Sequence, residues 1–158
     1  MFYIVTPDYP SVMQIPLRRG RFFTERDTLA STPVVVIDEV MARHIFPGQD
    51  PVGRQISLVV VGPVQIVGVV GHAKQWGLDS DDAATVRDQL YFPVLQVPDK
   101  FMSAAVAGLT LVLRTAPEPL SLVSAVRAQV AGPTQDQPIY AVRTMEQIIS
   151  GSDRKSVV

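Results

Sequence analysis

The sequence predicts an α+β fold in which βαβ-like elements at both ends of the chain flank a β-rich middle. Two observations predict this class. Residues 33–37 form an apolar segment rich in β-branched valine, and a helical pattern follows it at once. Between residues 54 and 95, several strand-like segments follow one another with no helical pattern between them. Strands and helices thus mix without the strict alternation of an α/β protein.

The first residues of the chain predict short elements. An apolar strand at residues 2–5 opens the sequence, and a short helix or turn follows that Pro16 ends. Residues 18–23 form an extended segment, and Thr24 is placed to cap a turn over residues 25–27.

A helix is predicted directly after the strand at residues 33–37. Asp38 stands where an N-cap residue belongs, and Pro47 marks the end of the helical pattern. Ile37, Met41 and Ile45 have i, i+4 spacing, so we expect them to share one buried face. A strand as apolar as this one must be covered on both sides, which suits a sheet with helices packed on it.

The most apolar stretch of the chain predicts two strands rather than a membrane helix. Residues 56–71 are fewer than the roughly 18 to 20 needed to cross a bilayer, and glycine and proline interrupt them. We therefore expect strands at residues 54–60 and 65–70, joined at Gly62 and Pro63. Gly62, Gly68 and Gly71 indicate bulges or close backbone approach.

The next segments alternate between loops and a strand. Residues 72–87 and 99–107 are predicted loops, and residues 90–95 are a predicted strand. Pro93 lacks the N–H that a central strand donates, so this strand is expected at a sheet edge.

The last third of the chain predicts two strands and two helices. Residues 109–114 alternate apolar and polar side chains, and residues 139–142 are a second short strand. The helix between them opens at Pro117 and closes at Gly132. Its expected buried stripe consists of Leu120, Val123, Val126 and Val130. Thr144 and Gln147 match a capping box at the start of the final helix, at residues 144–150.

Composition and motifs exclude several functions. The 158 residues carry a net charge of −1, which leaves no electrostatic footprint for nucleic acid or for an anionic membrane surface. The absence of cysteine excludes a disulfide framework, a cysteine zinc site and a thiol nucleophile. Neither a phosphate-binding glycine loop nor a nucleophile elbow occurs, so we expect no catalytic, cofactor or metal site.

The titratable candidates favour structural roles. His44 is expected to face solvent from its helix, and His72 to lie at a loop edge. His72 could act as a base with an aspartate, but no nucleophile stands beside it in sequence. An acidic cluster invites a calcium hypothesis but lacks the usual loop pattern, so a solvated loop is favoured: Asp79, Asp81 and Asp82. A basic cluster without interleaved aromatic residues favours a structural or solvated role: Arg18, Arg19 and Arg21.

The motifs, taken in order, resemble the periplasmic core domain of MacB-type and FtsX-like ABC transporter permeases. The resemblance covers residues 5 to about 154, and its specificity comes from the order and spacing of individually weak motifs. These are Tyr9-Pro10, the segments 13–23 and 33–39, Asp27, Ala42-Arg43, the segments 46–53 and 66–71, Gly77-Leu78, Tyr91-Phe92-Pro93, Gln96, and the segments 113–115, 125–127 and 142–147.

The resemblance implies a non-enzymatic domain with two lobes and no cofactor. The porter-like, βαβ-containing lobe would comprise residues 1–50 and 108–150, and the smaller β-rich lobe residues 51–107. From the resemblance we expect the chain to start partway into the porter-like lobe of the family, so that the domain is a partial one. In such transporters the domain lies outside the inner (cytoplasmic) membrane and couples cytoplasmic ATP hydrolysis to export or mechanotransmission.

The implied partners are a cytoplasmic ABC ATPase, a periplasmic adaptor and a second copy of the permease, with no nucleic acid among them. Trp76 and Leu78, in the loop at residues 72–87, are the candidate partner contacts. The alternative is a free-standing soluble module that binds a peptide or a lipophilic ligand through the β-rich middle and the Trp76 loop. A hydrolase using His72 is a third alternative, and it would require a pocket that joins His72 to a serine.

Overall fold

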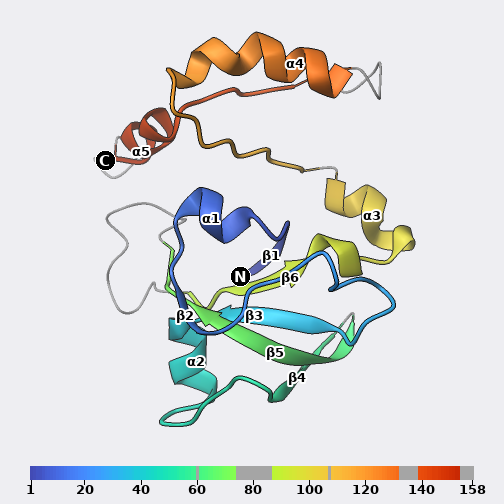
Figure 1. Cartoon of the computed structure of the whole chain (residues 1–158). Coiled ribbons are helices and arrows are strands. Elements are labelled where there is room, and N and C mark those ends of the chain that lie inside the picture. Colours follow the sequence, from blue (N-terminus) through green and yellow to red (C-terminus); the bar gives the residue numbers. More distant parts are fainter. Residues whose placement is uncertain (60, 74–86, 107, 132–138, 154–158) are drawn as a thin grey trace. The chain divides into compact units, whose positions relative to one another are not determined.

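The computed structural model describes residues 1–59, 61–73, 87–106, 108–131 and 139–153 (Figure 1). The chain divides into two compact units. The described residues of the first unit are 1–59, 61–73, 87–106 and 108–111, and those of the second begin at Val112. No helix within these ranges is both long and apolar enough to cross a membrane. The α+β class predicted from the sequence is confirmed.

A six-stranded mixed sheet organises the first unit. The main path runs β1-β6-β3-β5-β2, and β4 pairs with β5 beside this path. The β1–β6 and β3–β5 pairs are parallel, and the β2–β5, β3–β6 and β4–β5 pairs are antiparallel. The strands are β1 (Phe2–Val5), β2 (Leu17–Gly20), β3 (Val34–Asp38), β4 (Gln55–Leu58), β5 (Gly62–Val70) and β6 (Leu90–Pro93).

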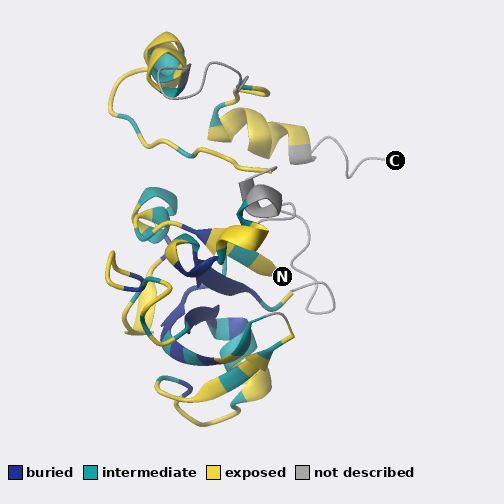
Figure 2. Ribbon diagram, turned by 90° about the vertical axis from the view of Figure 1, so that its right-hand side faces the viewer, coloured by how far each residue is buried: buried dark blue, intermediate teal, exposed yellow. Residues whose placement is uncertain are grey.

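Short helices cover both faces of this sheet. Side chains alternate along β3, so Val35 and Ile37 enter one apolar cluster while Val34 and Val36 enter another. Helix α2 (Glu39–Ile45) packs against the first cluster and α1 (Tyr9–Met13) against the second. Figure 2 shows the buried residues gathered along the strands. The predicted two-sided burial is confirmed for residues 34–37, and Pro33 just before β3 is half-buried.

Strand β5 carries a bulge and, beside it, a glycine at a close backbone approach. Its register with β3 shifts so that Val35 pairs with Ile66 but Val36 pairs with Gly68. A Cβ atom on Gly68 would lie 2.1 Å from the carbonyl oxygen of Arg21. The close backbone approach predicted for Gly68 is therefore confirmed.

Three predictions for the first unit are wrong. Strand β6 is internal, between β1 and β3, rather than at an edge; Pro93 is tolerated because it is the last residue of the strand. Ile45 is exposed, because α2 ends there and Phe46 packs against the core instead. Residues 99–106 form a helix, α3 (Asp99–Val106), which follows the 3-10 turn η1 (Val94–Gln96).

The described part of the second unit combines helices with extended or coil segments. It contains the 3-10 turn η2 (Pro119–Leu122), α4 (Val123–Ala131) and α5 (Met145–Asp153). The capping box is confirmed, since the Thr144 backbone N–H donates to Gln147 Oε1 at 3.0 Å and the Gln147 N–H to Thr144 Oγ1 at 3.2 Å. The stripe predicted on α4 is half-buried at Val123, Val126 and Val130 and exposed at Leu120.

The strands predicted at residues 109–114 and 139–142 do not form. No strand pairs with either segment within the described residues, and Leu109, Leu111 and Leu113 are exposed. Alternation favours a strand only where another strand supplies the hydrogen bonds, which is why the pattern misled here.

The sheet of the first unit combines strands from the first third and from the middle of the chain. Residues 1–50 supply β1, β2 and β3, which pair with strands from residues 51–107 in one sheet. These strands therefore pack around shared apolar clusters.

Candidate functional site

A buried polar network lies where β3 and β5 end and β6 begins. Asp38, the last residue of β3, is fully buried, and its Oδ2 lies 2.6 Å from Nδ1 of His72, two residues after β5. The side chain of His72 is 22% exposed, so the imidazole lies between this carboxylate and solvent. A buried carboxylate requires partners of this kind, since an unpaired buried charge is costly.

The second oxygen of Asp38 joins two further elements. Oδ1 accepts the backbone N–H of Met41 at 2.8 Å, which confirms the predicted N-cap of α2. It also accepts the backbone N–H of Gln89 at 3.2 Å, and the N–H of Asp38 itself donates to the carbonyl of Gln89 at 3.0 Å. One carboxylate thus fixes the end of β3, the start of α2 and the residue before β6.

Gln89 continues the network to Ala73. Its buried side chain donates from Nε2 to the carbonyl of Ala73 at 2.6 Å, and its Oε1 accepts the N–H of Ala73 at 3.3 Å. The hydroxyl of Tyr91, a fully buried residue, donates to the same Oε1 at 3.0 Å. The backbone N–H of His72 donates to Glu39 at 3.4 Å. We call Asp38, Glu39, His72, Gln89 and Tyr91 the loop-base network.

The loop-base network holds together the two ends of the segment predicted to carry partner contacts. Ala73 precedes residues 74–86 and Gln89 follows them. The two hydrogen bonds between Ala73 and Gln89 therefore hold the residues on either side of this segment close together. The candidate contacts Trp76 and Leu78 lie outside the described residues, as do Asp79, Asp81 and Asp82. Sequence reasoning missed the roles of Asp38 and Gln89 here, although Asp38 was recognised as a helix cap.

The geometry around His72 gives an anchor rather than a catalytic pair in the described part of the chain. The hydrogen-bond partners of His72 there are the carboxylates of Asp38 and Glu39. A hydrolase would need a hydroxyl nucleophile beside the imidazole, and no described residue supplies one to it. Within the same residues, no group of three or more acidic or histidine side chains is arranged to hold a metal ion.

His44 lies at the surface, as predicted. Its side chain is 61% exposed on α2, and its Nδ1 lies 2.7 Å from a carboxylate oxygen of Asp88. Exposed side-chain contacts of this kind contribute little to stability.

The predicted basic cluster divides into one structural arginine and two surface arginines. Arg21 donates from its two terminal nitrogens to both oxygens of the buried Asp27, at 2.8 Å each. Asp27 also accepts the N–H of Thr24 at 2.8 Å, and the N–H of Asp27 donates to the carbonyl of Thr24. Arg18 and Arg19 make looser contacts with Glu39 and Asp50. The structural role favoured for the cluster is confirmed for Arg21.

The Arg21–Asp27 pair gives the domain a predictable response to acid. The hydrogen bond from Arg21 holds the pKa of Asp27 below its usual range, with help from the Thr24 N–H. A carboxyl whose pKa is lowered by folding stabilises the fold above its unfolded pKa, and that contribution is lost as the pH falls through its folded pKa. Asp27→Asn is therefore expected to lower the free energy of unfolding at neutral pH by about 1–2 kcal/mol.

Urea unfolding of the parent chain and of Asp27→Asn at a series of pH values checks this expectation. The difference between the two should shrink below about pH 4, where the carboxyl of the unfolded parent takes up its proton. A difference that stays constant to low pH would show that Asp27 does not act through its charge.

The comparisons with known proteins identify the family of this domain. The family model described as the MacB-like periplasmic core domain matches residues 1–132. The chain belongs to this family. The resemblance inferred from the motifs is confirmed, and the match includes every element that builds the sheet and the loop-base network.

Curated relatives of this MacB-like domain are ABC transporter proteins, and two of those described here are named for export. The pyoverdine export ATP-binding/permease protein PvdT of Pseudomonas aeruginosa is 35% identical over 74 residues, which are 47% of this chain and 11% of PvdT. A macrolide export protein MacB of Agrobacterium fabrum is 32% identical over 124 residues, covering 77% of this chain and 18% of that protein. The ABC transporter permease YknZ of Bacillus subtilis is 25% identical over 154 residues, which cover 98% of this chain and 37% of YknZ. The chain thus spans well under half the length of these relatives.

Solved structures show the same fold. The periplasmic region of MacB from Actinobacillus actinomycetemcomitans matches with a TM-score of 0.63 at 18% identity, covering 99% of this chain and 66% of that one. The extracellular domain of YknZ matches with a TM-score of 0.50 at 19% identity, covering 78% of this chain and 57% of that one.

Proposed function

We propose that this MacB-like domain is the extracytoplasmic part of an ABC transporter permease anchored in the cytoplasmic membrane, where it couples ATP hydrolysis to export or mechanotransmission. The match of the MacB-like family model to residues 1–132 carries this proposal. The export functions printed for PvdT and MacB support it. We propose that the domain itself catalyses no reaction and that a cytoplasmic ABC ATPase supplies the energy for export or mechanotransmission.

The packing of the first unit suits a relay of movement. Every residue of β3 and β6 is buried, and apolar clusters cover both faces of the sheet. Because close-packed interiors have low compressibility, a displacement applied at one edge of such a sheet moves the whole unit. We propose that this unit moves as one block when the membrane segments tethered to it move.

The partner contacts proposed for this domain are Trp76 and Leu78. The loop-base network supports that assignment, because it fixes both ends of the segment that carries them. Tryptophan is among the residues enriched at the energetic centres of interfaces, and Leu78 lies two positions from Trp76. The proposed partners are a periplasmic adaptor and a second copy of the permease, and the two-lobed division of the family is proposed for the complete domain.

Purification of the gene product from membranes in mild detergent tests this function. We expect it to be isolated with an ABC ATPase and to support ATP hydrolysis. Trp76→Ala and Leu78→Ala should each weaken retention of the adaptor about tenfold while leaving the ATPase bound. A product found wholly in the soluble fraction would contradict the transporter function. Unchanged adaptor retention in both variants would contradict the contact assignment alone.

A further inference from the structure

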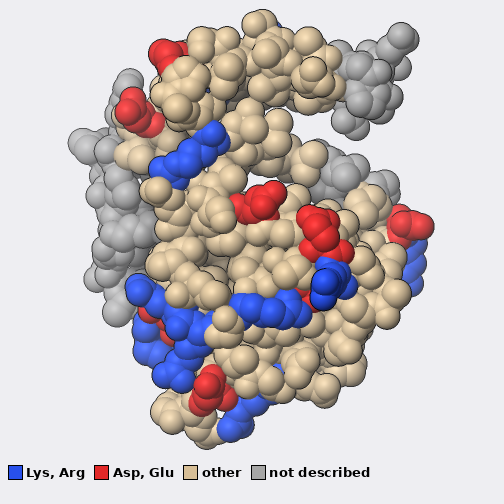
Figure 3. Space-filling view, in the orientation of Figure 1, with Lys and Arg blue, Asp and Glu red and all other residues tan. Residues whose placement is uncertain are grey.

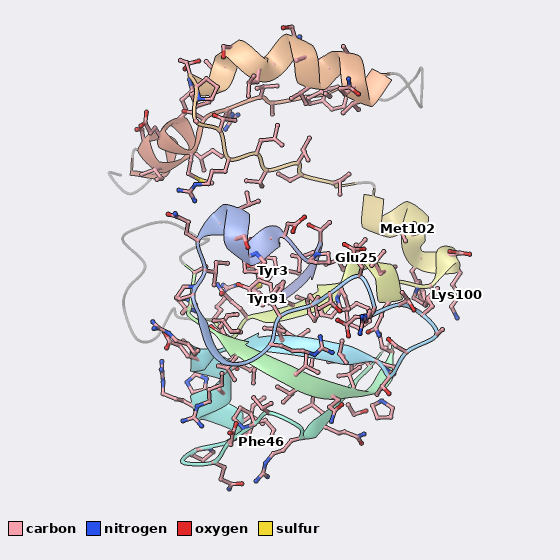
Figure 4. The ribbon with its side chains drawn as sticks, viewed as in Figure 1. Tyr3, Glu25, Phe46, Tyr91, Lys100 and Met102 are labelled. Atoms are coloured by element: carbon pink, nitrogen blue, oxygen red, sulfur yellow. The ribbon has the colours of Figure 1, made fainter. Side chains whose placement is uncertain are left out.

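A hollow of about 410 Å³ on the first unit gathers three arginines beside an apolar floor. It lies between β2, α2 and the turn that follows α2. Arg18 and Arg19 on β2 and Arg43 on α2 supply the positive charge, and Ala42, Phe46 and Val69 supply the apolar surface. Lys and Arg side chains gather at the lower left of Figure 3, where Figure 1 labels β2 and α2 in the same orientation. Figure 4 labels Phe46.

The arginines of the hollow are loosely held. Arg18 Nε lies 3.5 Å from Glu39, Arg19 Nη1 lies 3.4 Å from Asp50, and the two arginine side chains are 54% and 62% exposed. Arg21 differs from both, because it donates two hydrogen bonds of 2.8 Å to a buried carboxylate and so has a structural role. Arg18 and Arg19 can therefore turn toward a ligand without breaking the fold.

Arg43 has no ion pair or side-chain hydrogen bond with any described residue. The hollow thus holds three guanidinium groups and two carboxylates, and one positive charge is left unbalanced. Asp50 and Glu39 also have other partners: Asp50 Oδ1 accepts the N–H of Val52 at 3.0 Å, and Glu39 Oε1 accepts that of His72. These carboxylates can keep such bonds while the arginines move.

We propose that this hollow binds a phosphate ester whose apolar substituent packs on Phe46. Guanidinium groups recognise oxyanions through paired N–H donors, and three of them offer more donors than the two oxygens of a carboxylate can accept. A phosphate group has enough oxygens to engage all three. The same chemistry occurs in a soluble phosphate ester and in an anionic lipid headgroup, and the site does not depend on the transporter function proposed above.

Titration of the full 158-residue chain with phenyl phosphate, followed by amide chemical shifts, tests the site. Saturable shifts are expected around α2 and β2. Arg43→Gln should weaken binding about three- to tenfold, because it removes a charge-assisted contact. Arg127→Gln on α4 removes the same charge from an exposed residue of the other unit. The affinity of this variant for phenyl phosphate should therefore equal that of the parent. Circular dichroism checks that both variants fold.

Two further probes distinguish the sources of the ligand. Co-sedimentation with phosphatidylglycerol vesicles, lost in Arg43→Gln and absent with phosphatidylcholine vesicles, would assign a lipid headgroup. Saturable phenyl phosphate shifts without co-sedimentation would assign a soluble ester. The proposal would be overturned if the chain gave neither saturable phenyl phosphate shifts nor co-sedimentation with phosphatidylglycerol vesicles. It would also be overturned if Arg43→Gln and Arg127→Gln weakened phenyl phosphate binding equally.

Discussion

Asp38→Ala is expected to lower the free energy of unfolding of this domain by about 3–5 kcal/mol. The fully buried carboxylate accepts hydrogen bonds from His72, Met41 and Gln89, which belong to three different parts of the chain. Its removal leaves two backbone N–H groups without acceptors and takes away the N-cap of α2. Urea unfolding monitored by circular dichroism measures the loss.

Asp8 provides a matched control for this substitution. It is also the N-cap residue of a helix, but it is exposed and its side chain makes no capping hydrogen bond. Asp8→Ala should therefore change stability by less than about 0.5 kcal/mol. Asp38→Asn, which keeps an oxygen acceptor but removes the charge, should fall between the two. Equal stabilities of Asp38→Ala and Asp8→Ala would contradict the importance of the loop-base network.

Gly68→Ala is expected to destabilise the first unit by about 3 kcal/mol, because the new methyl group would meet backbone rather than a flexible side chain. The Cβ atom would lie 2.1 Å from the carbonyl oxygen of Arg21 and 3.0 Å from its carbonyl carbon. Relief requires that β2 move away from β5, which would disturb the pairing of Gly20 with Gly68.

Gly108→Ala is the control for Gly68→Ala, since a Cβ atom there meets no atom within 4 Å. Thermal unfolding should show a clear fall in midpoint for Gly68→Ala and little change for Gly108→Ala. A Gly68→Ala protein as stable as its parent would mean that the bulge in β5 can relax, and that the close approach of β2 is not required.

Local signals in the sequence were sufficient for elements that depend on neighbouring residues. The cap at Asp38 and the capping box at Thr144 follow from residue types within a few positions. Each rests on short-range geometry, such as a side-chain oxygen reaching an N–H two or three residues away. These features could be predicted because their partners are close in sequence.

Features that depend on distant pairing could not be predicted. His72 and Asp38 are 34 residues apart, and they meet because β3 and β5 run parallel with their ends at the same edge of the sheet. The internal place of β6 likewise depends on its pairing with β1, at the start of the chain. Gln96 is another case: its buried amide binds Val34 and the loop before it, more than 60 residues away.

The most direct test of the proposed function is which side of the membrane this domain occupies in the cell. The chain contains no cysteine, so Val59→Cys at a fully exposed position introduces a unique thiol into this domain. In spheroplasts that express the gene product, a membrane-impermeant maleimide should label this variant, and label it more strongly than the unsubstituted parent. Labelling that appears only after the cells are lysed would place the domain in the cytoplasm and contradict the account.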